Sequence, residues 1–271
     1  MKNIIANLLI VLVCISCTSS PYSGKQLTIV GTIHFPNEVI NADTLYKAIL
    51  DAEPDVILIE RDSSAFDEDF NRTYESQGNE AQAITKYLKD RPQTLLRPIE
   101  FEGRDTFRFQ TGLHTQANPV YSKLQELNVN DELTPEDQAS MNAFINHWGK
   151  LSSLSKESLY ALNNDSADAI LDTAKHYQYV VSKEMVNRYD AFDSMMVDSK
   201  GDSVSLRNYF DKWTQFEHYD RQDAMVANIK RTIADLPQSN FLVLVGYHHR
   251  YYIKKKLQQQ VPAIKLVEYY E

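Results

Sequence analysis

The sequence predicts an α/β fold, in which a mixed, mostly parallel sheet is flanked by helices and interrupted by a helical insertion. Short apolar runs of strand length alternate with amphipathic helical patterns near both ends of the chain, which is typical of βαβ units. The middle of the chain shows helical patterns and no convincing strand. At 271 residues, the chain is long enough to bury one large core.

The first 17 residues read as a lipoprotein signal peptide. Lys2 precedes a long apolar run, and the small residue Ser16 stands directly before Cys17, so we expect cleavage there and lipidation of Cys17. Cys14 stands where such sites usually carry Leu, which leaves a plain cleaved signal or an uncleaved anchor as alternatives. Residues 18–25 are predicted to form a polar tether. We therefore expect a lipid-anchored protein of the bacterial cell envelope, which faces the periplasm or the cell surface.

Strands and helices alternate along the rest of the chain. Two predicted helices, 41–54 and 79–92, each end at a proline and separate the first three strands. Further helical patterns lie at residues 133–151, 165–192 and 218–236. Strands are predicted at residues 27–30, 55–60, 94–101, 240–246 and 263–270. These elements predict one domain at residues 26–271, with a core of residues 26–112 and 215–271 and a helical insertion at about 115–215.

A strand-like run, a glycine, two residues and a histidine occur in that order twice, as LTIVGTIH (27–34) and LVLVGYHH (242–249). Glycine at the end of a strand can adopt a positive φ and allows another group to approach closely. Ligands of open α/β sheets bind outside the carboxyl ends of the strands. If these two strands are neighbours, we expect His34 and His249 to meet at that edge.

Carboxylates follow two other predicted strands. Glu60 and Glu100 each come at the end of an apolar run, where ionised groups are rarely left unpaired. Two histidines and one Glu form a common catalytic zinc set and also bind other divalent metals, so His34, His249 and Glu60 are candidate ligands. Glu100 would then support a ligand or act as general base. Without a metal, a histidine would act as general base beside an orienting carboxylate and an arginine that stabilises the oxyanion. A purely structural ion pair between Glu60 and an arginine is the remaining alternative.

The composition argues against several kinds of site and partner. The only two cysteines lie in the N-terminal segment, so the mature chain would have no intramolecular disulfide, thiolate catalyst or Cys-based zinc site. A net charge of −9, without a Lys/Arg-rich stripe, argues against a nucleic-acid partner.

These motifs together resemble the TraB, GumN and Tiki superfamily, whose members pair two G-x-x-H motifs with a Glu that ends the second strand. GTIH, EPDVILIER and VGYHH match these elements in order, over roughly residues 27–100 and 218–268. DRQDAMVANI is similar to the superfamily's ER-x-x-x-M-A helix, which brings Arg221 into the site. GTIHF and GNEAQ are similar to a bacterial branch of unknown function and bring in Glu80. The YHH turn is bulkier than the superfamily's usual GAGH turn.

The resemblance implies a surface-anchored hydrolase that cleaves a peptide or ester bond in a peptide or small-molecule substrate. Tiki-like members are metal-dependent proteases, which implies a divalent ion such as Mn, Co or Zn, whereas the more distant erythromycin esterases use an equivalent site without metal. The alternative is a non-catalytic lipoprotein that sequesters haem or a signalling peptide, because another distant relative binds haem. The expected catalytic residues are Glu60, Glu100 and Arg221, the expected metal ligands are His34, His249 and Glu60, and the expected pocket residues are Gly31, Gly246, His248 and Glu80.

Overall fold

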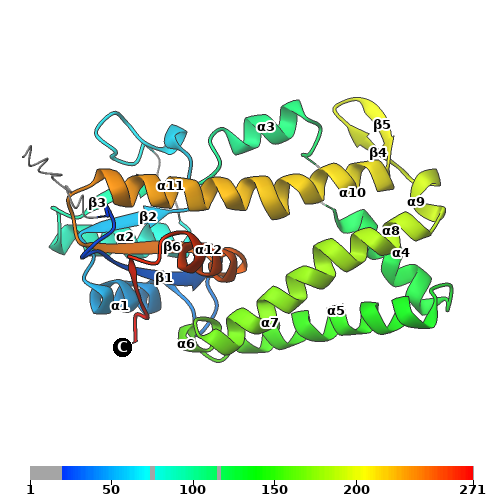
Figure 1. Ribbon diagram of the computed structural model, residues 1–271, viewed down its shortest axis with the longest axis horizontal. Helices are drawn as coiled ribbons and strands as arrows, with labels where there is room; N and C mark the ends of the chain where they lie inside the picture. Colours follow the sequence, from blue (N-terminus) through cyan, green and yellow to red (C-terminus); the bar gives the residue numbers. More distant parts are fainter. Residues whose placement is uncertain (1–19, 74–76, 115–116, 271) are drawn as a thin grey trace, which may run out of the picture.

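The computed structural model describes residues 20–73, 77–114 and 117–270. At its centre is a five-stranded parallel sheet in the order β3-β2-β6-β1-β7, which confirms the predicted α/β class (Figure 1). The predicted signal peptide and Cys17 lie outside the described residues, as do the first two residues of the predicted tether. The strands are β1 (Gln26–Thr32), β2 (Val56–Ile59), β3 (Leu95–Pro98), β6 (Asn240–Gly246) and β7 (Lys265–Val267).

Strand β6, which comes late in the chain, lies between β1 and β2. Thr32 of β1 is paired with Gly246, and Ile59 of β2 is paired with Leu244. The carboxyl ends of the first, second and penultimate predicted strands are therefore neighbours, as ligand sites in open α/β sheets require. The last strand and the third are shorter than predicted, so Glu100 lies beyond the end of β3.

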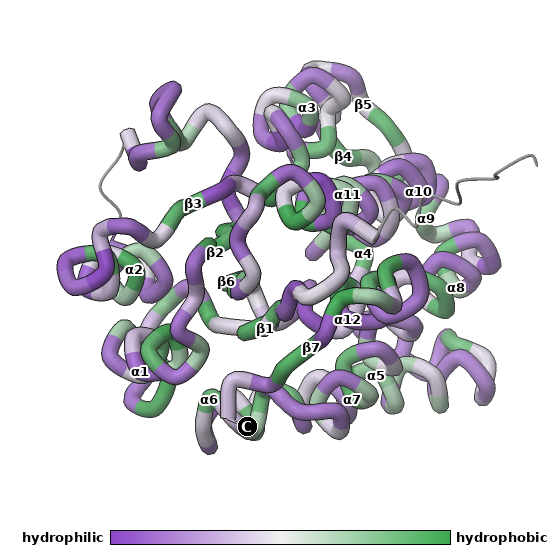
Figure 2. The backbone as a smooth tube through the Cα atoms, turned by 60° about the vertical axis from the view of Figure 1, so that its left-hand side comes forward, coloured by the Kyte–Doolittle hydropathy of each residue, from purple (hydrophilic) through white to green (hydrophobic). Residues whose placement is uncertain are grey.

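Helices cover both faces of the sheet, so the inner strands β1, β2 and β6 are almost completely buried and carry nearly continuous apolar runs. Hydrophobic residues follow the strands, and polar residues mark the outer helix surfaces (Figure 2). One face packs against α1 (Ala42–Ala52), α2 (Asn79–Asp90) and the short α6 (Leu159–Leu162). The other packs against α5 (Pro135–Leu154), α7 (Asp165–Lys175), α11 (Arg221–Asp235) and α12 (Tyr247–Gln260).

The predicted insertion extends away from the sheet and has a third apolar cluster of its own (Figure 1). Its further helices are α4 (Asn118–Val129), α8 (Ser182–Arg188), α9 (Ala191–Ser194) and α10 (Leu206–Thr214), preceded by α3 (Arg104–Gln110). The expectation of no strand here is wrong, since β4 (Met196–Ser199) and β5 (Asp202–Ser205) form an antiparallel hairpin. Its two turn residues, Lys200 and Gly201, both have positive φ, as the favoured two-residue hairpin turn requires. Each strand has only four residues, so no apolar alternation marks it.

Among the residues that the structure describes, three further helical segments are not α-helical. A 3₁₀ turn, η1, covers Ser63–Ala65, and two π-helical segments, η2 (His176–Val181) and η3 (Gln215–Asp220), join α7 to α8 and α10 to α11. Helix α11 begins at Arg221, within the helical pattern expected at residues 218–236, and it follows α10 and η3 without a break, so residues 206–235 form one continuous helical run. Short π-helical segments often occur at functional sites. Within the described residues, no helix is both long enough and apolar enough to span a membrane.

Candidate functional site

Two histidines from distant parts of the chain face one carboxylate at the carboxyl edge of the sheet. His34 follows β1, Glu60 follows β2, and His249 lies in the first turn of α12. The Nε2 atom of His34 is 3.9 Å from Glu60 Oε2, and the Nε2 atom of His249 is 3.6 Å from Glu60 Oε1. The predicted convergence of these three residues is therefore confirmed. Both distances exceed those of hydrogen bonds, so neither Nε2 atom is committed to Glu60.

Two glycines allow this close approach. A Cβ on Gly246 would lie 3.1 Å from His34 Nε2 and 3.2 Å from Glu60 Oε2, and the Gly246 N–H donates to Glu60 Oε2 at 2.7 Å. A Cβ on Gly31 would lie 2.9 Å from the Cα atom of Tyr247, where α12 begins. Gly246 has φ −51°, and Gly31 is an ordinary strand residue, so the expected positive φ is wrong at both positions. Glycine is required at both positions because any other residue would place a Cβ atom in this crowded space.

Replacing Gly246 with alanine is therefore expected to damage the site more than the fold. The backbone accommodates alanine, but the new methyl group would displace His34 and Glu60, with an overpacking cost of about 1 to 3 kcal/mol. A displacement of this kind in a catalytic site typically costs up to about 100-fold in rate. Thermal unfolding measures the first effect, and an assay of any reaction or ligand binding at this site measures the second. In the control Gly149→Ala, the new Cβ meets nothing within 4 Å, so we expect a stabilisation of about 0.5 to 1 kcal/mol and unchanged activity. Equal behaviour of the two variants would contradict this account.

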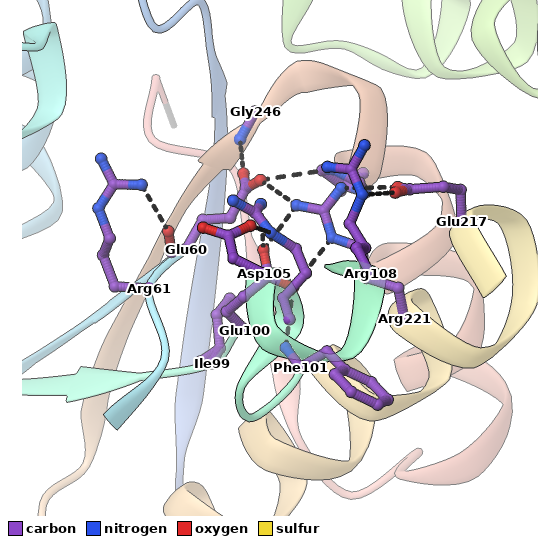
Figure 3. A network of polar contacts seen from close by, with 12 residues as sticks. Glu60, Arg61, Ile99, Glu100, Phe101, Asp105, Arg108, Glu217, Arg221 and Gly246 are labelled. Atoms are coloured by element: carbon purple, nitrogen blue, oxygen red, sulfur yellow. Dashed lines mark hydrogen bonds and ion pairs between the residues drawn. The ribbon is translucent and has the colours of Figure 1, made fainter. Parts of the chain in front are cut away.

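Arg221 binds the carboxylates that follow β2 and β3 (Figure 3). Its Nη2 atom donates to Glu60 Oε1 at 2.7 Å and to Glu100 Oε2 at 2.6 Å, and its Nε atom donates to Glu100 Oε1 at 2.9 Å. Its Nη1 atom donates to Glu217 Oε2 at 3.1 Å. Burial opposes the charge of Arg221, but the bonds to Glu100 and the charges of Glu60 and Glu217 raise its pKa. The structural ion pair considered for Glu60 is thus present, alongside the two histidines.

Further arginines complete the charge balance of this network. Arg104 Nη1 contacts Glu100 Oε2 at 3.1 Å, and Arg108 Nε lies 3.5 Å from Glu217 Oε1. The Glu100 Oε1 atom also accepts the N–H of Phe101 at 2.8 Å. Each oxygen of Glu100 therefore accepts two donors, which leaves no lone pair to take a proton from water. This favours the supporting role considered for Glu100 over the role of general base.

The two histidines have opposite protonation tendencies. Glu80, in the first turn of α2, bonds His34 Nδ1 through Oε1 at 2.9 Å, and this bond raises the pKa of His34. Because an ionised carboxylate only accepts hydrogen bonds, Nδ1 carries the proton and Nε2 remains available. Burial, followed by the charge of Arg221, lowers the pKa of His249 well below its usual value, so its imidazole is neutral. Gln222 Oε1 lies 3.3 Å from His249 Nδ1 and favours the same tautomer.

His248 points into a different part of the site. Its ring packs edge-on against Trp148, with centroids 5.0 Å apart, and burial lowers its pKa well below the usual value. It lines a cavity of about 310 Å³ between the sheet edge and the insertion, together with His249 and Arg221. The insertion contributes Lys175 to the same cavity. The predicted pocket role of His248 thus has a physical basis. No sequence signal marks Lys175, which stands in an ordinary amphipathic helix.

Two buried residues that no sequence motif marks, Arg250 and Asn163, hold the end of β1. Strand β7 pairs with β1 only as far as Thr28, so the next backbone groups need other partners. Arg250 Nε donates to the carbonyl of Ile29 at 3.1 Å. The Asn163 side chain accepts the Gly31 N–H at 2.6 Å and donates to the Gly31 carbonyl at 2.8 Å. These side-chain bonds take the place of the backbone bonds that a longer β7 would make, and they hold the segment that leads to His34.

The donor types at the site suit a divalent metal, but their arrangement does not form a metal cage. Imidazole and carboxylate groups are common ligands of Zn, Mn and Co, and an acceptor holds Nδ1 of both His34 and His249, as in many metal-bound histidines. Across the described residues, however, no group of three or more His, Cys, Asp or Glu side chains is placed to hold a metal ion. Arg221 and the Gly246 N–H already engage both oxygens of Glu60. The divalent ion therefore stays a prediction.

Comparisons of the chain with protein-family models, curated proteins and solved structures found no match.

Proposed function

We propose that this protein hydrolyses an ester or amide bond, using a water molecule that His34 activates as general base. The observation that carries the proposal is the pairing of His34 with Glu80, which directs the free Nε2 atom toward Glu60 and His249. A base oriented by a carboxylate is a recurring arrangement in hydrolytic sites. The His34 side chain is 52% exposed, so water and substrate reach it.

In this proposal, the water lies between the two imidazoles. His34 Nε2 removes one proton as the water oxygen attacks the substrate carbonyl, and Glu80 stabilises the resulting imidazolium. The neutral His249 accepts the other O–H of the water through Nε2 and so orients it. Glu60 is not the base in this proposal, since the Arg221 Nη2 atom and the Gly246 N–H already donate to its two oxygens.

Arg221 is the group best placed to stabilise the negative charge that develops on the carbonyl oxygen. Its Nε atom, both N–H groups of Nη2 and one N–H of Nη1 donate to carboxylates, so one N–H of Nη1 remains for a substrate. Arg221 also lines the cavity where a substrate would bind. A fixed donor in a site sheltered from water is an effective oxyanion stabiliser.

The charge balance supports a metal-independent reaction. The carboxylates of Glu60, Glu100 and Glu217 are matched by the guanidinium groups of Arg104, Arg108 and Arg221. A dication held by Glu60 would add positive charge beside Arg221 without a further carboxylate in contact. Water activation by His34 needs no such change.

The experiment combines a substrate panel with metal removal. The purified protein is assayed against p-nitrophenyl esters and internally quenched peptides, before and after treatment with a chelator, and its metal content is measured by mass spectrometry. We expect hydrolysis that is unchanged by chelation. Loss of activity on chelation, with recovery on addition of Mn, Co or Zn, would replace this mechanism with the metal-dependent one. If no panel member is cleaved faster than by a His34→Gln variant, the protein is not a hydrolase of this kind.

The predicted family, anchor and location belong to the same proposal. The order of the GTIH, EPDVILIER and VGYHH motifs supports membership of the TraB, GumN and Tiki superfamily. The sequence of residues 1–17 supports a lipid anchor at Cys17 and a place in the bacterial cell envelope. A ligand-binding function without catalysis is the second candidate, and the cavity beside His248 is the observation that favours it.

A further inference from the structure

We propose that the cavity beside the His/Glu site binds an anionic group on a flat, apolar part of the substrate, and that Lys175 provides the positive charge that selects it. The assignment of this ligand as substrate rests on the proposed hydrolase function, whereas anion binding itself does not. The cavity volume of about 310 Å³ is at the lower end of the range for small-molecule sites.

Lys175 is a buried cation without a matching carboxylate. Its residue exposure is 5%, and its Nζ atom donates to the neutral amide oxygen of Gln178 at 2.9 Å. Within the part of the chain that the structure describes, no Asp or Glu oxygen lies within 4.0 Å of this Nζ atom. Burial lowers the pKa of Lys175 to about 7, which reflects the cost of an uncompensated charge. An anion in the cavity would remove that cost.

The other charged groups that face the cavity are already compensated. Among the described residues that line the cavity, Glu217 is the one carboxylate, and its two oxygens contact Arg221 Nη1 at 3.1 Å and Arg108 Nε at 3.5 Å. Burial keeps His248 and His249 neutral. The surplus charge in the cavity is therefore positive and is centred on Lys175.

Aromatic rings supply the apolar part of the wall. Tyr121, Tyr179 and Trp213 line the cavity, and the rings of Tyr179 and Trp213 lie with centroids 5.5 Å apart. Lys175 Nζ lies 5.0 Å from the ring centroid of Trp148 and 5.2 Å from that of Tyr179. A flat group with an anionic end would contact these rings and place its charge at the ammonium group.

The cavity is continuous with the proposed reaction centre, because Arg221 and His249 belong to both. The π-helical segments η2 and η3 provide Gln178, Tyr179 and Glu217 to its wall. A substrate with its anionic end at Lys175 would direct its other end toward His34 and Glu60. The cavity thus defines a specificity subsite rather than a second reaction centre.

Fluorescence titration tests this proposal without an activity assay. The chain has two tryptophans, of which Trp213 lines the cavity and Trp148 contacts Lys175, so ligands there change the emission. Benzoate and phenyl phosphate serve as anionic probes, and benzamide serves as the neutral probe of similar shape. The variants are Lys175→Met, which keeps the length of the stem, and the control Lys150→Met, which alters an exposed lysine of α5. Circular dichroism checks that both variants fold.

We expect the wild type to bind an anionic probe at least about tenfold more tightly than benzamide, because bonds to charged groups are stronger. Lys175→Met should remove that preference, and Lys150→Met should retain it. A preference for benzoate identifies a carboxylate ligand, and a preference for phenyl phosphate identifies a phosphate. Equal affinity of the wild type for benzoate, phenyl phosphate and benzamide would overturn the proposal, even if Lys175→Met does not fold. Binding that persists in a protein without hydrolytic activity would uphold this site and contradict the proposed function alone.

Discussion

Replacing Arg221 with methionine is expected to lower the free energy of unfolding by about 3 to 5 kcal/mol, because it leaves the buried Glu60 without its guanidinium partner and removes a cation from two further carboxylates. The guanidinium group contacts Glu60, Glu100 and Glu217, and the Arg221 side chain is only 9% exposed. Urea denaturation measures the loss. Arg221→Lys should recover part of the stability, since an ammonium group keeps the charge but lacks the planar fork that bonds two carboxylates at once.

A surface ion pair provides the matched control. Lys255 contacts Asp172 at 2.8 Å, and both side chains are about half exposed. Lys255→Met should therefore cost less than about 1 kcal/mol. If Arg221→Met costs no more than this control, the network does not stabilise the ends of β2 and β3, and the positioning of Glu60 needs another explanation.

Replacing His34 with glutamine is expected to lower the hydrolytic rate by about 10²- to 10⁴-fold, which is the usual contribution of a general base. The change should leave the unfolding curve nearly unaltered, because the imidazole is half exposed. His114→Gln, at an exposed histidine that makes no contact with Glu60, is the control and should keep full activity. Comparable rates for these two variants on a substrate that the wild type cleaves would exclude His34 as the base.

The pH profile separates a base from a residue that only holds the structure. The bond to Glu80 raises the pKa of His34, so the basic form appears, and activity rises, as the pH increases through that raised value. Glu80→Gln removes the negative charge from this bond, which lessens the stabilisation of the imidazolium, and should move the acidic limb of the profile to lower pH. The raised pKa also means that the charged pair adds stability below about pH 6.5, which is lost as the pH rises through the folded-state pKa. An unchanged limb in Glu80→Gln would contradict the pairing.

The parts of the site that lie on β-strands were predictable because their signals are local. An apolar run that ends in glycine and is followed by histidine identifies a strand and its exit within eight residues, and Glu60 stands directly after another such run. A helical pattern over residues 218–236 likewise indicated α11, which begins at Arg221. The sequence did not indicate that the π-helical segment η3 makes α11 continuous with α10.

The sequence by itself determined the α/β class, the two glycine-histidine strand ends and the carboxylates that follow two further strands. Only the tertiary structure decided that β6 lies between β1 and β2, which brings His34, Glu60 and His249 together. It also decided which turn of the insertion faces the sheet, and so placed Lys175 in the cavity wall. The physical reason is that side-chain periodicity reports which face of an element is buried, whereas strand order and helix docking depend on contacts between residues far apart in the chain.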